Sequence, residues 1–224
     1  MPEIKERPIL FSAPMVRAIL EGRKTVTRRP VKGGQIPTED PAEEGRLRWS
    51  AIGQRDPRYG FCLFGETEAE CAQELATFGR CPYGRPGDWL YVRETFNRTN
   101  PGGAAGVYYY RADGGFPKSI GGGTFTDAES WKPSIHMPRI ASRILLEITA
   151  VRVERLQEIT PAQVTAEGVS THGEALWGGE WWVDAPDQAI EDARKDFADL
   201  WTSTGGDWSS NPWVWVVEFK QVTP

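Results

Sequence analysis

The sequence predicts a mixed α+β fold, in which the strands form a small closed or nearly closed barrel and short helices lie at its rim. Two patterns lead to this prediction. Apolar side chains recur at helical spacing over residues 13–21 and 187–202, whereas aromatic and apolar side chains alternate over residues 213–220. The predicted order is strand, helix, several strands, short helix, longer helix and closing strand. Strands at the two ends of such an order must pair non-locally, which is typical of a small barrel.

The N-terminal elements follow from short local signals. Residues 8–11 form an apolar run that is typical of a short strand. Ser12 is the predicted N-cap of the first helix, and Gly22 stands where that helix is expected to stop. An extended run is then expected over residues 25–29.

A capping box marks a short helix in the C-terminal half. Thr160 is the predicted N-cap, Pro161 follows at the first helical position and Gln163 stands at N3. Gly168 ends this helix. Propensity adds a helix over residues 66–78 and strands over 89–96, 107–111 and 144–156.

The length fits one elaborated domain or two small ones, and we expect a single domain over residues 1–224. The chain has 224 residues, of which 39% are hydrophobic and 25% are charged, and its formal net charge is −5. Because a protein that coats a nucleic-acid backbone is usually basic, the acidic balance favours a small ligand or a short, specific nucleic-acid feature. Residues 30–58 are expected to be a surface insertion, and the Gly-rich part of 97–134 a flap or a disordered segment.

The sequence gives no sign of a membrane span, a disulfide framework or a metal site. No stretch approaches the roughly 20 apolar residues of a membrane helix, and the N-terminal segment lacks the apolar core of a secretory signal. We therefore expect a soluble, cytoplasmic protein. Cys62, Cys71 and Cys81 are spaced unlike the close pairs of zinc modules. With His136 they offer four ligands in principle, but free thiols are the simpler interpretation, and neither a metal nor a cofactor is expected.

Three stretches carry a recognisable family pattern. The first is residues 19–28, which contain Gly-Arg-Lys-Thr-x-Thr, and the second is the Pro-Gly-Asp turn of residues 86–88 before a strand. The third comprises the strand over 144–154, the Ala-Glu-Gly helix end of residues 166–168 and the closing strand over 214–220. Together they resemble the ASCH superfamily, a branch of the PUA-like barrels, over about half of the chain. Relative to the minimal family pattern, the chain has long insertions near residues 30–80 and 97–135. These resemble the insertions of the larger phage- and prophage-type members.

The resemblance implies an activity and the residues that perform it. The small bacterial amidohydrolases of this superfamily remove the acyl group from N4-acetylcytidine, using a Lys, a Thr three residues later and a distant Glu on the short helix. Matching by motif places these roles on Lys24, Thr27 and Glu167. The implied reaction is hydrolysis of a linear amide in an N4-acylated cytidine or cytosine-type substrate, with Thr27 as nucleophile, Lys24 as base and Glu167 as proton shuttle.

The three residues can perform these roles if the pKa of Lys24 is lowered and if Lys24 and Thr27 lie close together. A Thr hydroxyl becomes a nucleophile only when a neighbour accepts its proton, and Lys24 can do so if burial or nearby arginines lower its pKa. Positions i and i+3 of a strand lie on opposite faces, so Lys24 and Thr27 converge only if Lys24 lies in the turn after Gly22 or if a bulge intervenes. Glu167 at a helix C-terminus faces the negative end of the dipole, which disfavours its charge and suits a proton shuttle.

Each of these residues also has a plain structural interpretation. The Gly-Arg-Lys segment could be a solvated basic turn at a helix end, Thr27 a strand residue and Glu167 a surface residue of a helix. The sequence alone leaves both interpretations open.

Six further residues are candidate substrate contacts. Trp89 could stack on a base, and the Glu94 carboxylate could accept a hydrogen bond from the exocyclic amine of that base. Arg139 and Arg143 could face a phosphate or a carbonyl group, although exposed arginines at the entry to a strand are an equal alternative. The remaining two are Arg23 and Arg28, which flank Lys24 and Thr27.

Two other functions compete with amide hydrolysis. The first is a non-catalytic module that binds RNA or modified DNA in the same cleft, with basic residues from 17 to 32 as phosphate contacts. It predicts salt-sensitive binding that survives loss of the Thr27 hydroxyl. The second is a ribonuclease, which predicts RNA cleavage that is lost on mutation of Lys24 or Glu167.

Overall fold

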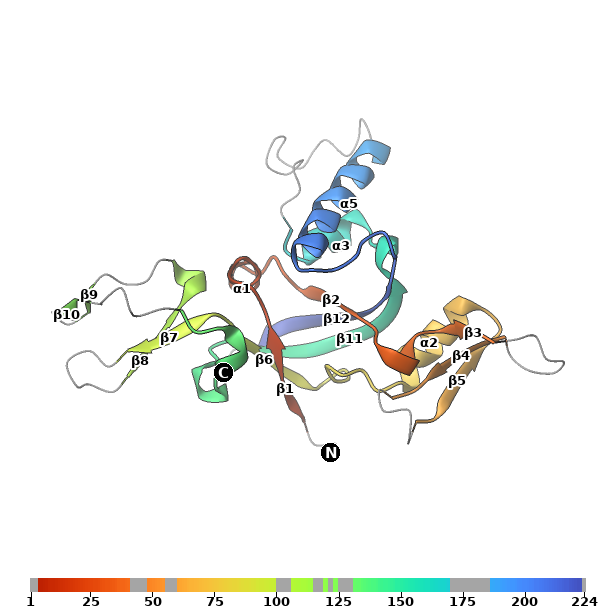
Figure 1. Ribbon diagram of the computed structural model, residues 1–224, viewed down its shortest axis with the longest axis horizontal. Coiled ribbons are helices and arrows are strands. Elements are labelled where there is room, and N and C mark those ends of the chain that lie inside the picture. The colour runs from red at the N-terminus through yellow and green to blue at the C-terminus, as the bar shows by residue number, and fades with distance from the viewer. Residues whose placement is uncertain are drawn as a thin grey trace.

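The computed structural model describes residues 4–40, 48–54, 60–99, 106–114, 119–120, 123–124, 131–169 and 186–222. A mixed five-stranded sheet lies at the centre of the molecule (Figure 1). Its strand order is β1 (Glu6–Leu10), β6 (Trp89–Arg93), β11 (Leu145–Arg155), β12 (Trp213–Val222) and β2 (Val26–Pro30). β1 runs parallel to β6, and all other neighbours are antiparallel. The predicted α+β class is confirmed.

The sheet is open, so full closure of the barrel, one of the two predicted forms, is wrong. β1 and β2 are its two edge strands, and the chain passes from one to the other through α1 (Ala13–Leu20). Across the gap, the Arg29 guanidinium donates to the backbone oxygen of Leu10 at 2.7 Å. The two edges are thus joined by a side chain and not by a ladder of backbone hydrogen bonds.

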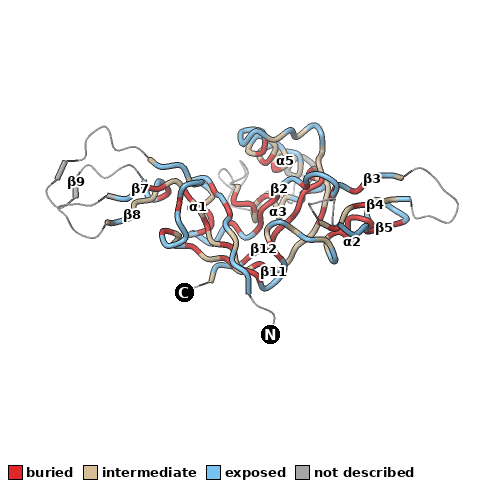
Figure 2. The backbone as a smooth tube through the Cα atoms, turned by 60° about the horizontal axis from the view of Figure 1, so that its bottom comes forward, coloured by how far each residue is buried: buried red, intermediate tan, exposed pale blue. Residues whose placement is uncertain are grey.

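Both faces of the sheet are covered around β12. Trp213, Trp215, Val217 and Phe219 lie in one core, which they share with α2 (Glu68–Phe78). Val214 and Val216 lie in a second core with α3 (Pro161–Ala166) and α5 (Pro186–Ser203), the two helices above the sheet in Figure 1. The alternation predicted for the closing strand is therefore confirmed, and the buried residues in Figure 2 concentrate along the central strands.

The first insertion is folded and contributes to the core. It forms the three-stranded sheet β3 (Thr38–Glu39), β4 (Trp49–Ile52) and β5 (Cys62–Gly65), followed by α2. Thr67 and Glu70 form a capping box at the start of α2, which confirms the helix predicted over 66–78. Because Val31 and Ala51 are buried, the prediction of a surface insertion over residues 30–58 is wrong for this part of the segment.

The second insertion begins with the hairpin of β7 (Phe96–Thr99) and β8 (Val107–Tyr110), which projects to the left in Figure 1. The short strands β9 (Ser119–Ile120) and β10 (Gly123–Thr124) pair with each other. Most of the Gly-rich segment on which a flap was expected lies outside the described residues. Short 3-10 turns occur at Gly33–Gln35, Arg111–Asp113, Ser134–His136, Arg139–Ala141 and Leu156–Glu158.

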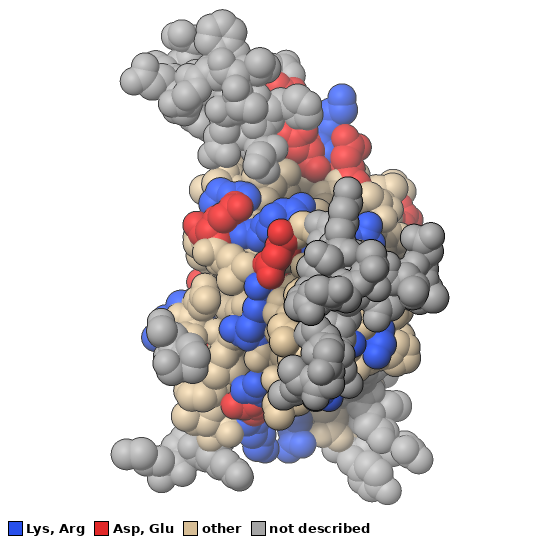
Figure 3. Space-filling view, turned by 90° about the vertical axis from the view of Figure 1, so that its left-hand side faces the viewer, with Lys and Arg blue, Asp and Glu red and all other residues tan. Residues whose placement is uncertain are grey.

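The surface carries charges of both signs. On the face shown in Figure 3, Lys and Arg side chains lie next to Asp and Glu side chains. Among the described residues, no helix is both long and apolar enough to cross a membrane.

Candidate functional site

A cavity of about 320 Å³ lies beside the free edge of β2. One wall is polar and comes from β2 and the residues before it, together with the end of α3. The opposite wall comes from the last turns of α5 and the loop that follows. The residues that line it are Leu10, Phe11, Ser12, Met15, Lys24, Thr27, Arg28, Arg29, Pro30, Glu167, Phe197, Leu200, Trp201, Thr204, Gly205 and Gly206.

Lys24 lies in the turn between α1 and β2. Gly22 has a φ of +74°, which ends α1 in the left-handed conformation that glycine favours, and β2 begins only at Val26. Lys24 thus precedes the strand, which is the arrangement required for it to converge with Thr27. Its backbone forms an isolated antiparallel bridge with Glu167, 143 residues further along the chain.

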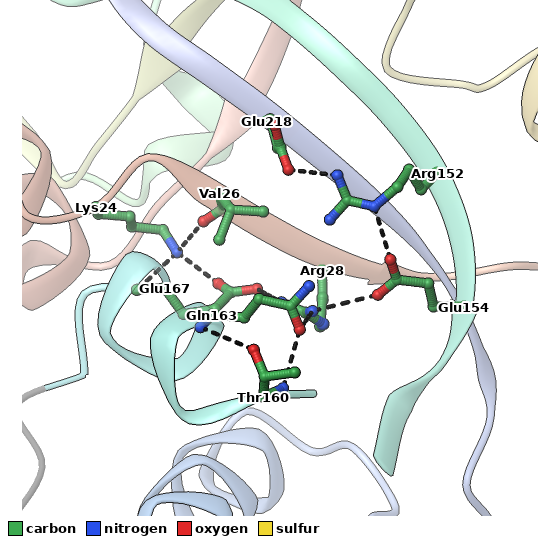
Figure 4. Close-up of polar contacts among 9 residues, drawn as sticks. All are labelled: Lys24, Val26, Arg28, Arg152, Glu154, Thr160, Gln163, Glu167 and Glu218. Carbon is green, nitrogen blue, oxygen red and sulfur yellow. Dashed lines mark hydrogen bonds and ion pairs between the residues drawn. The ribbon is translucent and has the colours of Figure 1, made fainter. Parts of the chain in front are cut away.

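The Lys24 ammonium group is buried and fully hydrogen-bonded. Its side chain is 2% exposed, and Nζ donates to Val26 O at 2.8 Å, to Glu167 O at 2.8 Å and to Glu167 Oε2 at 2.7 Å (Figure 4). These three bonds account for the three N–H groups of a charged lysine. Nζ also lies 5.5 Å from the centre of the Phe11 ring.

Glu167 is held at the C-terminus of α3 by the local chain conformation. It is the C-cap residue, and Gly168 follows with a φ of +81°. A Cβ atom at position 168 would lie 2.8 Å from Ala18 Cβ and 3.0 Å from Lys24 Cβ. Position 168 therefore requires glycine for two reasons: its positive φ angle and the close approach of α3 to Lys24.

Arg28 fixes the second oxygen of the Glu167 carboxylate. Its Nη1 donates to Glu167 Oε1 at 3.3 Å, and its Nη2 donates to Gln163 Oε1 at 2.9 Å and to Glu154 Oε2 at 3.4 Å (Figure 4). Gln163 Oε1 also accepts from the backbone N–H of Thr160, the N-cap of α3. Arg28 therefore ties both ends of α3 to β2, and its side chain is only 1% exposed.

Burial makes the charged form of Lys24 less favourable than it is in water. Burial lowers the pKa of the Lys24 ammonium from its usual value; the Glu167 carboxylate opposes this shift, and the guanidinium groups of Arg29 and Arg28 add to it. Transfer of one proton from Nζ to Glu167 Oε2 across the 2.7 Å hydrogen bond would leave a neutral amine beside a neutral carboxylic acid. A buried site favours such a neutral pair more than water does, because burial penalises charge.

The free edge of β2 exposes backbone groups to the cavity side of the strand. Thr25 O accepts from Phe219 N, and Val31 N donates to Trp213 O, so the Thr25 carbonyl and the Val31 N–H are directed toward β12. By alternation along the strand, Val26 and Arg28 direct their backbone groups toward the free edge. The bond from Lys24 Nζ to Val26 O agrees with this direction. Pro30, which has no N–H group, then has its nitrogen on the unpaired side, as expected for an edge strand.

The position of the cavity at an edge strand explains why both faces of β2 contribute to it. Val26 faces the core of α3 and α5, and Arg28 shares that face because it is two residues further along. Thr27 points to the other face, yet it lines the same cavity and is 3% exposed. The cavity therefore wraps around the strand edge.

The α5 wall of the cavity was not predicted from the sequence. The helical spacing predicted only an apolar face that packs into the core. Its residues Phe197, Leu200 and Trp201 pack in the core and also line the cavity. The only signal in the sequence was a Trp at a helix end followed by Gly205 and Gly206. A Cβ atom at Gly206 would lie 2.2 Å from Trp201 Nε1, so this glycine makes room for the indole edge.

Three buried donors around the cavity have no hydrogen-bond partner within the described part of the chain. They are Arg28 Nε, Arg29 Nε and Trp201 Nε1. Each of these groups can donate and none can accept. The site is therefore rich in donors, which matches a ligand that carries carbonyl or phosphate oxygens.

The candidate residues divide between this cavity and other places. Lys24, Thr27, Arg28 and Glu167 line it together. Arg23 does not: its Nε donates to Glu21 at 2.9 Å, and its Nη1 donates to the backbone oxygen of Gly168 at 3.3 Å.

The other candidate contacts also lie outside the cavity. Arg143 binds Glu94 at 2.9 Å and Asp113 at 2.8 Å, and burial raises the pKa of the Glu94 carboxyl against the opposing effect of Arg143. Arg139 pairs with Glu6 and lies over the Tyr91 ring. Trp89 lines a separate cavity beside the Pro86–Gly87 turn.

The cysteines are free thiols in different environments. Cys62 is exposed, Cys71 is buried and Cys81 is partly buried. Burial raises the pKa of Cys71 and of Cys81 to about 11. Within the described ranges, no group of three or more His, Cys, Asp or Glu side chains could hold a metal ion.

Comparison of the chain with protein-family models, with curated proteins and with solved structures gave no match.

Proposed function

We propose that this chain is an amidohydrolase of the ASCH type that removes the acyl group from N4-acylated cytidine or a related cytosine-type substrate. The observation that carries the proposal is the convergence of Lys24, Thr27 and Glu167 on one cavity, although Glu167 lies 143 residues from Lys24 in the chain. The family, the PUA-like fold and the substrate are parts of the same proposal, and the Gly-Arg-Lys-Thr-x-Thr motif supports them.

In the proposed reaction, Thr27 is the nucleophile. The neutral amine of Lys24 accepts the proton of Thr27 Oγ1 as that oxygen attacks the acyl carbonyl carbon. The neutral amine arises when Lys24 transfers a proton to Glu167 Oε2, which lies 2.7 Å away. The pair then holds a base and an acid at once, which amide hydrolysis requires.

The oxyanion that forms needs hydrogen-bond donors. The backbone N–H of Arg28 is directed toward the free edge of β2 and is the proposed donor, with the nearby guanidinium groups of Arg28 and Arg29 adding positive charge. Donors of this kind act strongly because the cavity fixes them before the charge develops.

The leaving nitrogen needs a proton, and Glu167 supplies it. The carboxylic acid of Glu167 donates to N4 as the C–N bond breaks, so cytidine leaves and the acyl group remains as an ester on Thr27. A water molecule then attacks this ester, and its proton returns through the pair. The sum is amide plus water giving amine plus carboxylic acid, with Thr27, Lys24 and Glu167 restored.

The two walls of the cavity suggest how the substrate lies. In the proposed orientation, the acyl chain extends toward Phe197, Leu200 and Trp201 on α5, and the cytosine ring lies near Phe11. A cavity of about 320 Å³ falls at the lower end of the range for small-molecule sites, roughly 300–1,000 Å³. This size fits a nucleoside with a short acyl group better than a large polymer.

Incubation of the protein with N4-acetylcytidine and with bulkier N4-acyl cytidines tests the proposal, with release of cytidine measured by chromatography. The wild type should release cytidine, and Lys24→Ala and Thr27→Ala should not. Absence of release from every acyl cytidine would contradict the proposal.

A second candidate function is binding of RNA or modified DNA in the same cavity. The Arg29 guanidinium, which lines the cavity and is partly exposed, favours it, because arginine commonly binds phosphate oxygens. This candidate predicts salt-sensitive oligonucleotide binding that Thr27→Ala leaves intact.

A further inference from the structure

A second cavity, of about 470 Å³, lies at the other end of β1 and shares no residue with the first. It lies where the start of β1 meets the end of α2 and the loop of residues 79–88. The first cavity, in contrast, begins at Leu10, where β1 ends.

This cavity is strongly basic, although the chain as a whole is acidic. Four cationic side chains line it against the single carboxylate of Asp88; they are Lys5, Arg7, Arg80 and Arg85. Arg7 is paired with Asp88 at 2.9 Å. The side chains of the other three form no ion pair with any described residue, and all three residues are exposed.

The cavity is organised by a buried carboxylate. Asp88, which is 4% exposed, accepts from the Arg7 guanidinium at 2.9 Å and from the backbone N–H groups of Lys5 and Arg85 at 3.2 Å each. A Cβ atom at Gly84 would lie 3.0 Å from both Arg7 Nη1 and Asp88 Oδ2, so this glycine leaves room for the pair. Asp88 thus fixes the backbone at Lys5 and Arg85. The backbone of Arg80 is held separately, by Gly53 O and by Gln35 Nε2.

An exposed aromatic ring completes the site. Phe78, at the end of α2, lines the cavity and is 59% exposed. An exposed Phe normally costs hydrophobic free energy, and beside free cations it offers a flat surface for a nucleobase. A groove that combines cations with an aromatic ring is the common arrangement for single-stranded nucleic acid.

We propose that this second cavity binds a nucleotide unit, with its phosphate held by Lys5, Arg80 and Arg85 and its base stacked on Phe78. The source of the unit is a free nucleotide or one residue of a single-stranded oligonucleotide, since both carry the same chemistry. The site is independent of the amidohydrolase cavity.

Fluorescence anisotropy of the wild-type protein with a labelled oligouridylate tests the proposal. The competitors are the unlabelled oligouridylate, uridine 5′-monophosphate, uridine and inorganic phosphate. The monophosphate should compete at least ~10-fold better than uridine, because uridine lacks the phosphate. A stronger competition by the oligonucleotide than by the monophosphate indicates a polymer as the source, and equal competition indicates a free nucleotide.

Variants assign the binding to this cavity. Arg80→Ala combined with Arg85→Ala should raise Kd at least ~10-fold. The slope of log Kd against log salt concentration should fall by roughly 1.4, because two phosphate contacts are lost. Phe78→Ala should raise Kd about 5-fold or more. Lys132→Ala combined with Lys195→Ala removes the same charge from two exposed positions outside the cavity and should leave Kd within about 2-fold of the wild type.

Three outcomes would overturn the proposal: no saturable binding, equal competition by uridine and its monophosphate, or equal weakening by the Arg pair and the control Lys pair. Because none of the variants touches the first cavity, release of cytidine should stay unchanged in each. The two proposals therefore succeed or fail separately.

Discussion

Lys24 and Glu167 form a buried ion pair with an Nζ–Oε2 distance of 2.7 Å, and both side chains are at most 5% exposed. Their backbones also meet in an isolated bridge. Burial of two charges costs free energy that their attraction offsets only when the geometry and the other hydrogen bonds are good. The surrounding contacts from Val26 and Arg28 meet this requirement, and the pair lines the same cavity as Thr27.

Lys24→Arg tests whether this position supplies a base. Arginine keeps the positive charge but cannot be deprotonated in a protein. We expect kcat/KM for N4-acetylcytidine to fall by about 10²- to 10⁴-fold, the usual contribution of a general base. Circular dichroism and thermal unfolding of the same preparation check that the fold is kept. An active Lys24→Arg variant would show that the position has only a charge role.

The pH dependence of kcat/KM should be bell-shaped, because the active form of the pair holds one shared proton. At low pH both groups are protonated and no base is present; at high pH the shared proton is lost and no acid is present. Burial lowers the pKa of Lys24, so the alkaline limb should lie below the range of an ordinary lysine.

Glu167→Gln should change the shape of this profile as well as its height. With no acid at position 167, the residual rate should rise with pH as Lys24 loses its proton, and the fall at high pH should disappear. A variant with lower activity but an unchanged bell would mean that Glu167 only positions Lys24.

Arg28→Met tests the structural role of the Arg28 network. The substitution leaves Glu167 Oε1 without its Arg28 donor and removes one of the two donors to Gln163 Oε1. Loss of one partner in a buried pair costs about 3 kcal/mol or more. Arg152 is the matched control, because it also contacts Glu154 but its side chain is 38% exposed. Arg152→Met should cost less than about 1 kcal/mol. Denaturant unfolding of both variants measures the difference, and equal costs would contradict the assigned network.

Trp201→Ala tests whether the α5 wall sets acyl preference. Removal of the indole widens the cavity, so kcat/KM for bulky acyl cytidines should rise relative to that for N4-acetylcytidine. Gly206→Ala should act in the opposite direction, because its methyl group would push the indole edge, 2.2 Å from the ideal Cβ position, into the cavity. An unchanged ratio of rates in both variants would place the acyl group elsewhere.

Asp88→Asn tests the link between the second cavity and acid stability. Hydrogen bonds from the backbone of Lys5 and Arg85 and from the Arg7 side chain hold the pKa of Asp88 below its usual value, although burial opposes them. The stabilisation is therefore present above the unfolded pKa and is lost as pH falls through the folded pKa. The variant should be about 2 kcal/mol less stable at neutral pH, with the difference disappearing in acid. A difference independent of pH would contradict this origin.

The sequence predicted elements with strong local signals. The Thr160 capping box, the turn at Gly22 and the alternation of Trp213, Trp215 and Val217 each depend on nearby residues alone, and the structure has all of them. Barrel closure depends on how β1 and β2 approach each other. No local pattern encodes that approach, and the Arg29 side chain bridges the gap instead.

The polar wall of the cavity could be predicted because a motif carries it. Lys24 and Thr27 lie within one short signature, and Glu167 belongs to a recognisable helix end. The opposite wall could not, because Phe197 and Trp201 have the spacing of any buried helix face. Arg143 and Glu94 have compatible charges, and the structure pairs them with each other outside the cavity.

The most direct test of the central claim compares Thr27→Ser with Thr27→Val in one cytidine-release assay. Serine keeps a hydroxyl group at this position, and valine keeps the branched shape of threonine without the hydroxyl. We predict that Thr27→Ser retains measurable turnover of N4-acetylcytidine and that Thr27→Val loses at least ~10³-fold in kcat/KM. A Thr27→Val protein as active as the wild type would contradict the assignment of Thr27 as the nucleophile.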